Sequence, residues 1–183
     1  EKKLSMIEHL TKSYELTNDM SHLEEKEIFL ESTSSMVFDR VNRIVYAGIS
    51  PRTNAVKLII WCRQNNYELV LFETESHTGS PIYHTDVLMY VGTEIIGICF
   101  DVIKEEHRDY VKEKVNKYHD VVELSPEQIE NFCGNAIEAK NKNDEPIIME
   151  LAIYKIVRIL VYQANYHQLH LHLRTCSEYF YYI

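Results

Sequence analysis

The residues best suited to chemistry in this chain lie in short polar segments at the ends of apolar runs. The segment "SPIYHTDVLMYVG" places His84 and Asp86 two positions apart, directly before an apolar run. Residues two apart on a strand point to the same side, so this spacing predicts an imidazole and a carboxylate on one side of the start of a strand. Histidine is the natural general acid or base near neutral pH, and a neighbouring carboxylate orients it. A hydrogen-bonded structural histidine is the alternative interpretation.

Two further charged residues stand where expected strands end. Glu31 in "FLESTSS" follows apolar residues and precedes small hydroxyl residues, so it is either a partnered structural acid or a ligand for a cation. Arg52 in "SPRTN" lies between an expected strand and an expected helix, where loops present binding residues on a rigid frame. An arginine there can hold a carboxylate through two parallel hydrogen bonds, although an exposed turn arginine is the simpler explanation.

The cysteines are widely spaced and form no C-x-x-C pair, which indicates reduced thiols and fits a cytoplasmic protein. Cys62 and Cys99 fall within apolar segments and are expected in the core. Cys133 in "FCGN" and Cys176 in the tail are candidate nucleophiles, because a thiolate beside a histidine is activated. A rival interpretation of the tail is a zinc site, although its spacing fits no standard finger. Its ligands would be His167, His170, His172 and Cys176.

The composition predicts one globular domain over residues 1–183. The hydrophobic fraction of 45% and the charged fraction of 26% are those of a soluble protein. The net charge of −9 argues against a nucleic-acid partner, which would favour a basic surface. The longest apolar runs, such as "IIGICF", are too short to cross a membrane. The chain opens with "EKKLSMIEHL" and no initiator methionine, from which we expect a piece of a longer protein.

The elements that must position these residues recur in one order. Two strands, a helix with Thr53 as its N-cap, and a third strand are expected at 35–40, 43–50, 53–66 and 67–73. The same order is expected at 87–92, 94–101, 104–118 and 120–125. A less regular third copy has helices at 126–132 and 152–162 around strands at 135–140 and 146–151, and another helix is expected at 3–14. This alternation predicts an α/β domain of strand-strand-helix-strand modules.

In order and spacing, six segments together resemble the carboxy-terminal part of the arginine deiminase / dimethylarginine dimethylaminohydrolase superfamily, and most closely its amidinotransferase or citrulline-utilisation-type subgroup. They are "FLESTSSMVFDR", "YAGISPRTN", "LVLFE", "PIYHTDVLMYVG", "LSPEQIENFCGN" and "IIMELAIY". The resemblance covers residues 5–160 and leaves 163–183 as a divergent tail. It implies a pentein-type α/β propeller, incomplete here with about three of five modules.

The resemblance also implies a chemistry that needs no metal or organic cofactor. In this family a cysteine thiolate attacks the guanidinium carbon of arginine or a methylarginine, and hydrolysis of the amidino-enzyme gives citrulline. In the transferases an amine accepts the amidino group instead. His84 matches the catalytic histidine, and Glu31 matches the glutamate that pairs with the guanidinium and the histidine. Arg52 matches the arginine that binds the substrate α-carboxylate, Asp86 matches the Asp of H-x-D, and Cys176 stands in the nucleophile's place.

Several positions depart from the family pattern. The usual "LEGTGS" is "LESTSS" here, so Ser32 and Ser34 replace glycines that allow close backbone approach. The usual "FAGN" is "FCGN", so Cys133 takes an alanine position, and the glycines before the family's terminal cysteine are replaced in "HLHLRTC". The amino-terminal modules with a guanidinium-binding aspartate are absent. We therefore expect an amidine hydrolase, an amidinotransferase, or a non-catalytic remnant or binding module, whose open strand edges favour homo-oligomers.

Overall fold

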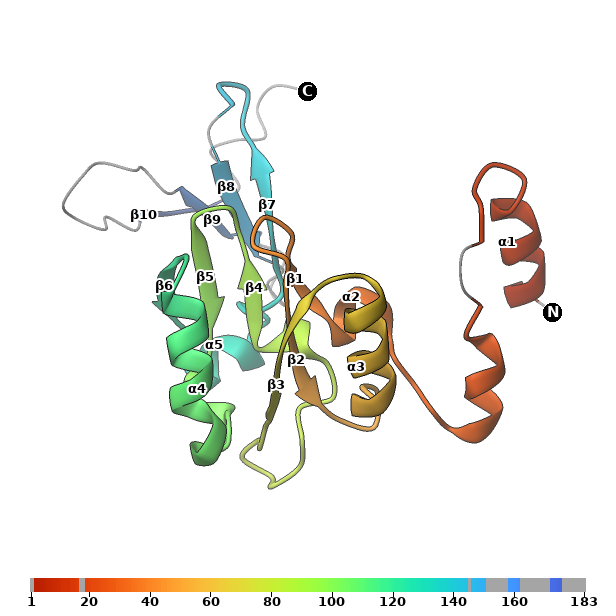
Figure 1. The fold of residues 1–183 in the computed structure, drawn as a ribbon. Coiled ribbons are helices and arrows are strands. Elements are labelled where there is room, and N and C mark those ends of the chain that lie inside the picture. The colour runs from red at the N-terminus through yellow and green to blue at the C-terminus, as the bar shows by residue number, and fades with distance from the viewer. Residues whose placement is uncertain (1, 17–18, 145, 151–157, 162–171, 176–183) are drawn as a thin grey trace.

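Three small sheets with flanking helices make up the described part of the chain (Figure 1). The structure is a computed structural model, and it describes residues 2–16, 19–144, 146–150, 158–161 and 172–175. Parallel and antiparallel strand pairs both occur, and helices connect the parallel pairs. The mixed α/β class expected from the sequence is confirmed.

The first sheet follows the order strand, strand, helix, strand. β1 (Val37–Asp39) pairs antiparallel with β2 (Ile44–Ile49), and β2 pairs parallel with β3 (Glu68–Glu73). The parallel pair requires a crossover, which α3 (Ala55–Gln64) provides. Glu31 lies just before α2 (Ser32–Ser35), and Arg52 lies in the turn before α3. A bridge between Leu30 and Thr53 joins these two segments.

Asn54 is the N-cap of α3, one residue later than the sequence predicts. Its side chain accepts a hydrogen bond from the Lys57 amide at 3.0 Å. Thr53 is buried and takes part in a 3.3 Å contact with the Ser50 hydroxyl. The prediction of Thr53 as the cap is wrong because the capping oxygen must face the free amides of the first turn, and only Asn54 does.

The second sheet repeats the order of the first. β4 (Met89–Val91) pairs antiparallel with β5 (Ile95–Ile98), and β5 pairs parallel with β6 (Asp120–Glu123). The crossover contains a short 3-10 turn, η3 (Phe100–Val102), and the helix α4 (Glu105–Asn116). Two successive units therefore share one connectivity. Their closure into a propeller stays a prediction.

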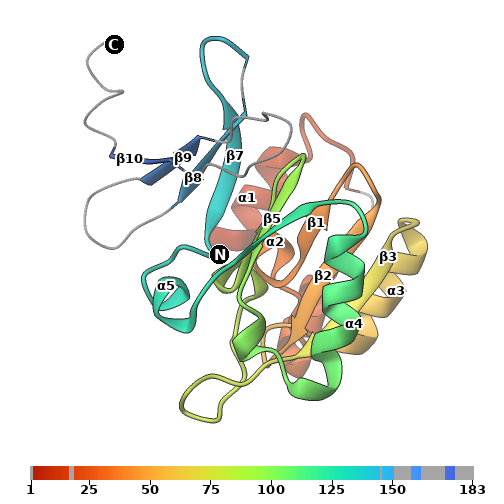
Figure 2. The same ribbon diagram turned by 90° about the vertical axis from the view of Figure 1, so that its left-hand side faces the viewer.

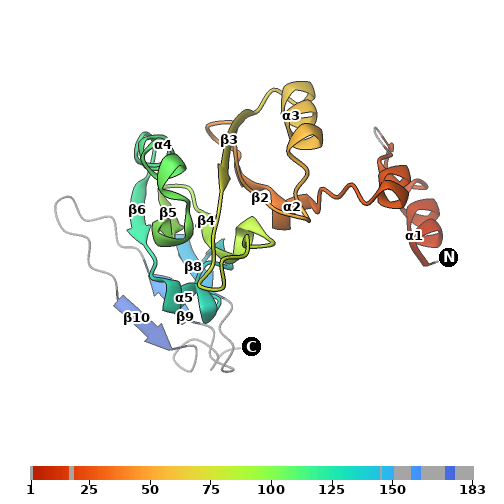
Figure 3. The same ribbon diagram turned by 90° about the horizontal axis from the view of Figure 1, so that it is seen from below.

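β2 is apolar on both faces because it packs against both units. Val45 and Ala47 on one face form a cluster with Leu58 of α3. Ile44 and Tyr46 on the other face belong to the main core, which extends through α4 into the second sheet. Figure 3 shows α3 and α4 on opposite sides of the first sheet. This core holds the ends of the two units together, and the candidate residues lie at that seam.

The third region differs from the expected repeat. α5 (Pro126–Glu130) begins with a capping box, in which the side chains of Ser125 and Gln128 each bind the other residue's backbone amide. The strands that follow form an antiparallel sheet in the order β10-β9-β8-β7 (Figure 2). They are β7 (Ala136–Lys140), β8 (Pro146–Glu150), β9 (Arg158–Val161) and β10 (His172–Thr175). The helix expected at 152–162 is wrong over β9, since periodicity alone does not separate a short apolar strand from a buried helix.

The amino-terminal segment lies apart from the sheets. α1 (Lys2–Leu10) lies within the helix expected at 3–14, apart from its first residue, and is followed by the 3-10 turn η1 (Ser21–Lys26). Figures 1 and 3 both show α1 well away from the strands. Among the residues described, no helix combines the length and the apolar character that crossing a membrane would need.

Candidate active site

Three separate segments bring Glu31, Arg52 and His84 into contact. Glu31 directly precedes the single-turn helix α2 (Ser32–Ser35), and Arg52 lies in the turn between β2 and α3. His84 has an extended backbone and directly precedes the 3-10 turn η2 (Thr85–Val87). The first two segments come from the first unit and the third opens the second, so the site lies at the seam between units.

A single carboxylate joins the other two side chains. Glu31 Oε2 lies 2.5 Å from His84 Nε2, and Glu31 Oε1 accepts a hydrogen bond from Arg52 Nη1 at 2.8 Å. The side chains of His84 and Glu31 are 22% and 32% exposed, whereas that of Arg52 is 52% exposed. The imidazole and the carboxylate are therefore partly shielded from solvent, while about half of the Arg52 side chain is exposed.

The two contacts keep Glu31 ionised. The hydrogen bond with His84 is the largest cause of the lowered pKa of the Glu31 carboxyl. Burial acts in the opposite direction, and the hydrogen bond with Arg52 adds a smaller lowering. A depressed folded-state pKa stabilises the fold at pH values above the unfolded-state pKa. This stabilisation is lost as the pH falls through the folded-state value. The site therefore holds a fixed negative charge near neutral pH.

Asp86 lies in a different environment from the other predicted residues. Asp86 belongs to η2, and β4 begins only at Met89. The prediction that His84 and Asp86 lie on one strand, with their side chains on the same side, is therefore wrong. Among the described contacts, no hydrogen bond joins Asp86 to His84. Burial raises the pKa of Asp86, and the charge of His84 and a hydrogen bond with Ser34 act in the opposite direction. Asp86 lines a cavity of about 400 Å³ against β1, β4 and β7.

Glu31 and Arg52 line a second pocket, of about 440 Å³, on the side of η1. The pocket contains two basic side chains, Arg52 and Lys57, and two acidic ones, Glu24 and Glu31. The sequence motifs did not point to Lys57. Its position in the first helical turn after "SPRTN", close to Arg52, was the signal that could have identified it. A pocket lined by both positive and negative side chains suits a small ligand that carries a positive and a negative group.

Ser32 occupies a backbone conformation that favours glycine. Its φ is 48°, in the left-handed region, at a position where the resembling family has glycine. A side chain in that conformation costs about 1–2 kcal/mol. We expect Ser32→Gly to raise the free energy of unfolding by about 1 kcal/mol, after allowance for the added freedom of the unfolded chain. Thermal or urea unfolding measures this change.

Ser34→Gly is the matched control for that prediction. Ser34 is the other serine in a family glycine position, but its φ is not positive and its side chain hydrogen-bonds Asp86. The same substitution there should lower the stability, because it removes a contact and weakens a helical turn. Equal effects of the two substitutions would show that backbone strain at Ser32 is not the cause.

The described cysteines are all buried. Cys62 and Cys99 lie in the core as predicted, and burial raises the pKa of both thiols. Cys133 is also buried, behind Gly134, where an added Cβ would lie 2.0 Å from the Val87 carbonyl oxygen. Cys176 lies outside the described residues, as do the side chains of the alternative zinc site.

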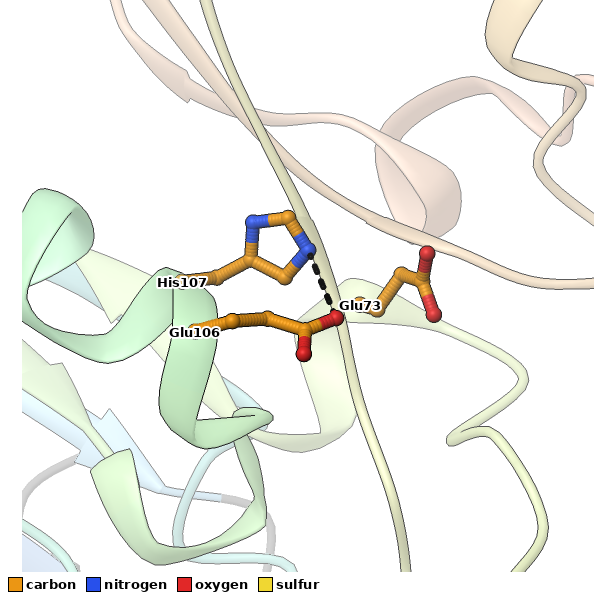
Figure 4. A group of neighbouring side chains, drawn as sticks. All are labelled: Glu73, Glu106 and His107. Carbon is orange, nitrogen blue, oxygen red and sulfur yellow. Dashed lines mark ion pairs between the residues drawn. The ribbon is translucent and has the colours of Figure 1, made fainter.

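A second cluster of charged side chains lies at the start of α4. Glu73 from the end of β3 lies near Glu106 and His107, with ligand atoms within 4.8 Å of one another (Figure 4). Glu73 is already paired with the Lys104 ammonium, which lowers its pKa. The positive end of the helix dipole also disfavours a cation there and favours the acidic side chains. These contacts explain the cluster as an ion pair and a charged helix start.

Comparison with known proteins identifies the family. The family model described as "N,N dimethylarginine dimethylhydrolase, eukaryotic" matches residues 1–165. The chain belongs to this family. This match confirms the superfamily that the sequence motifs predict. The subgroup stays a prediction. No curated protein sequence matches it.

Solved structures share the fold of this dimethylarginine dimethylhydrolase-family chain. Apo ArgZ, an arginine dihydrolase from cyanobacteria, matches with 18% identity and a TM-score of 0.52 over 68% of this chain and 19% of ArgZ. The substrate-bound amino-terminal domain of ArgZ matches with 20% identity and a TM-score of 0.51 over 68% and 44%. A mutant of AgrE in complex with L-arginine matches with 13% identity and a TM-score of 0.51 over 62% of this chain and 18% of AgrE. The chain thus spans less than half of each.

Proposed function

We propose that this chain carries the histidine, glutamate and arginine of an amidine hydrolase that acts on arginine or a methylarginine. The observation that carries the proposal is the Glu31 carboxylate, held at 2.5 Å from His84 and at 2.8 Å from Arg52. Family membership supports the same chemistry, and similar proteins are arginine dihydrolases by name. A small guanidine is therefore the proposed partner.

Each charged group has a task in the proposed reaction. The planar substrate guanidinium pairs with Glu31, and this contact holds the guanidinium carbon in place. The Cys176 thiolate forms a C–S bond to that carbon, and the C–N bond to the leaving amine breaks as His84 gives the amine a proton. Water then attacks the same carbon, His84 takes its proton, and the C–S bond breaks to release citrulline and the thiolate.

Arg52 occupies the place that the substrate head group would take. Its guanidinium already binds Glu31 Oε1, and it is chemically the same group as that of the substrate. Because the Arg52 side chain is half exposed, it can leave Glu31 when a substrate α-carboxylate offers another partner. Lys57 lines the same pocket and adds a second positive charge. Substrate binding is then an exchange of ion pairs, in which each guanidinium gains a new carboxylate.

This exchange gives the test of the proposed function. Arginine and dimethylarginine should yield citrulline, while agmatine, which lacks the α-carboxylate, should be turned over less well. Arg52→Ala should raise KM for arginine by about 10–100-fold, the effect of losing a hydrogen bond between charged groups. KM for agmatine should stay the same or fall. Citrulline release and substrate consumption measure both.

Arg63→Ala is the control for Arg52→Ala, because Arg63 is an exposed arginine in the last turn of α3. It should leave both KM values unchanged. A guanidino product that forms only when an amine is added would favour the amidinotransferase instead. Failure of every guanidine to react would contradict both enzymes and would favour a binding module of the same fold.

A further inference from the structure

Two buried hydroxyl groups lie behind the three charged residues. The side chains are those of Ser35, at the end of α2, and Thr85, at the start of η2, with 0% and 1% of their surfaces exposed. Buried hydroxyl groups need hydrogen-bond partners, since an unpaired one destabilises the folded state. The partners of these two connect all the segments of the candidate site.

Ser35 ties the Glu31 segment to the Arg52 segment. Its Oγ accepts a hydrogen bond from the Glu31 amide at 3.1 Å and donates one to the Arg52 carbonyl oxygen at 2.8 Å. The Glu31 amide also contacts that carbonyl oxygen, at 3.3 Å. One serine hydroxyl therefore sets the separation of two backbone segments whose side chains form the Glu31–Arg52 ion pair.

Thr85 ties the His84 segment to Ser35. Its Oγ donates to the Ser35 carbonyl oxygen at 2.8 Å and accepts from the Gly48 amide in β2 at 3.0 Å. Thr85 directly follows His84, so these two bonds fix the backbone from which the imidazole projects. A hydroxyl has one donor and two acceptor positions, and Ser35 and Thr85 each use both functions here.

We propose that the Ser35–Thr85 hydroxyl pair is a positioning device, which sets the distance between the His84 imidazole and the Glu31 carboxylate. The catalytic role of this pair rests on the proposed function, whereas its hydrogen bonds do not depend on the substrate. Neither residue touches the reacting atoms. They act through Glu31, Arg52 and His84, and an error of about 1 Å in such positions can cost about 100-fold in rate.

Thr85→Val tests the pair, because it keeps the shape and removes the hydroxyl. We expect the Glu31–His84 contact to lengthen and the Glu31 pKa to rise toward its ordinary value, since the contact with His84 is the main cause of its lowering. Carboxyl carbon NMR of the full chain, titrated with acid, measures that pKa without any substrate. The kcat for arginine should fall by at least about 10-fold with a smaller change in KM. Thr85→Ser, which keeps the hydroxyl, should restore both values.

Ser35→Ala provides a second test if Thr85→Val does not fold. It removes the bonds to Glu31 and Arg52 but leaves Thr85 bonded to Gly48, and it should also raise the Glu31 pKa. Ser125→Ala is the control for stability, because it lowers the stability by removing a helix cap far along the chain. It should leave the Glu31 pKa unchanged.

The two claims can fail separately. Folded Thr85→Val and Ser35→Ala proteins with the wild-type Glu31 pKa would overturn the positioning role and leave the hydrolase proposal intact. A raised Glu31 pKa in these variants supports the positioning role. If that result accompanies a wild-type protein that turns over no guanidine, the positioning role stands and the proposed function fails.

Discussion

Replacement of His84 with alanine should lower kcat for arginine by about 100- to 10,000-fold, the range that a positioned general acid and base supplies. The variant removes the group that protonates the leaving amine and activates water in the proposed reaction. It also removes the largest cause of the lowered Glu31 pKa, so that pKa should rise. Steady-state kinetics and carboxyl NMR measure the two effects.

The fold should survive this change, because His84 is partly exposed and lies outside the core cluster. His77→Ala is a matched control, since His77 is an exposed histidine that also contacts a carboxylate, Glu130 at 3.2 Å. It should leave kcat unchanged. Full turnover by a folded His84→Ala protein would remove the histidine from the mechanism and reduce the Glu31–His84 contact to a structural one.

Replacement of Cys176 with alanine should abolish both turnover and covalent labelling. Loss of a nucleophile typically lowers kcat by at least about 1,000-fold, because the covalent route is closed. A haloamidine carries the same planar cationic head group as the substrate and should modify wild-type protein at a single cysteine. Mass spectrometry of the labelled protein locates that site.

Cys133→Ala is the control for the labelling experiment. The three described cysteines are buried, and burial disfavours the reactive thiolate in Cys62 and Cys99. Cys133→Ala should therefore be labelled as the wild type is. Undiminished labelling of the Cys176→Ala protein, or labelling spread over several cysteines, would contradict a nucleophile at position 176.

Much of the fold follows from local patterns in the sequence. The strand and helix positions of the first two units follow from short apolar runs separated by polar turns, and these runs are long enough to define their type. The capping box at Ser125 is likewise a local feature, because its two partners, Ser125 and Gln128, lie within one helical turn. The switch from Thr53 to Asn54 was not predictable, because both residues are good caps and the bridge between Leu30 and Thr53 decides between them.

The candidate site depends more on contacts between distant segments. The family motifs pointed to Glu31, Arg52 and His84, and the structure places these side chains in contact, while their roles stay predictions. Composition and periodicity did not predict that Arg52 binds Glu31, because the two residues lie on separate turns brought together by the sheet. Ser35 and Thr85 were also missed, since a buried hydroxyl has no periodic signal in a sequence. The small hydroxyl residues beside each charged residue were the only hint.

The position of the site at a seam between units has a practical consequence. Residues 77–80 are exposed and lie between the Arg52 turn and the His84 turn. A chain divided there would leave Glu31 and Arg52 on one fragment and His84 on the other, with the shared core as the force that reunites them. Under the proposed hydrolase function, such a divided protein would release citrulline only when its two fragments meet, and citrulline would then report their proximity.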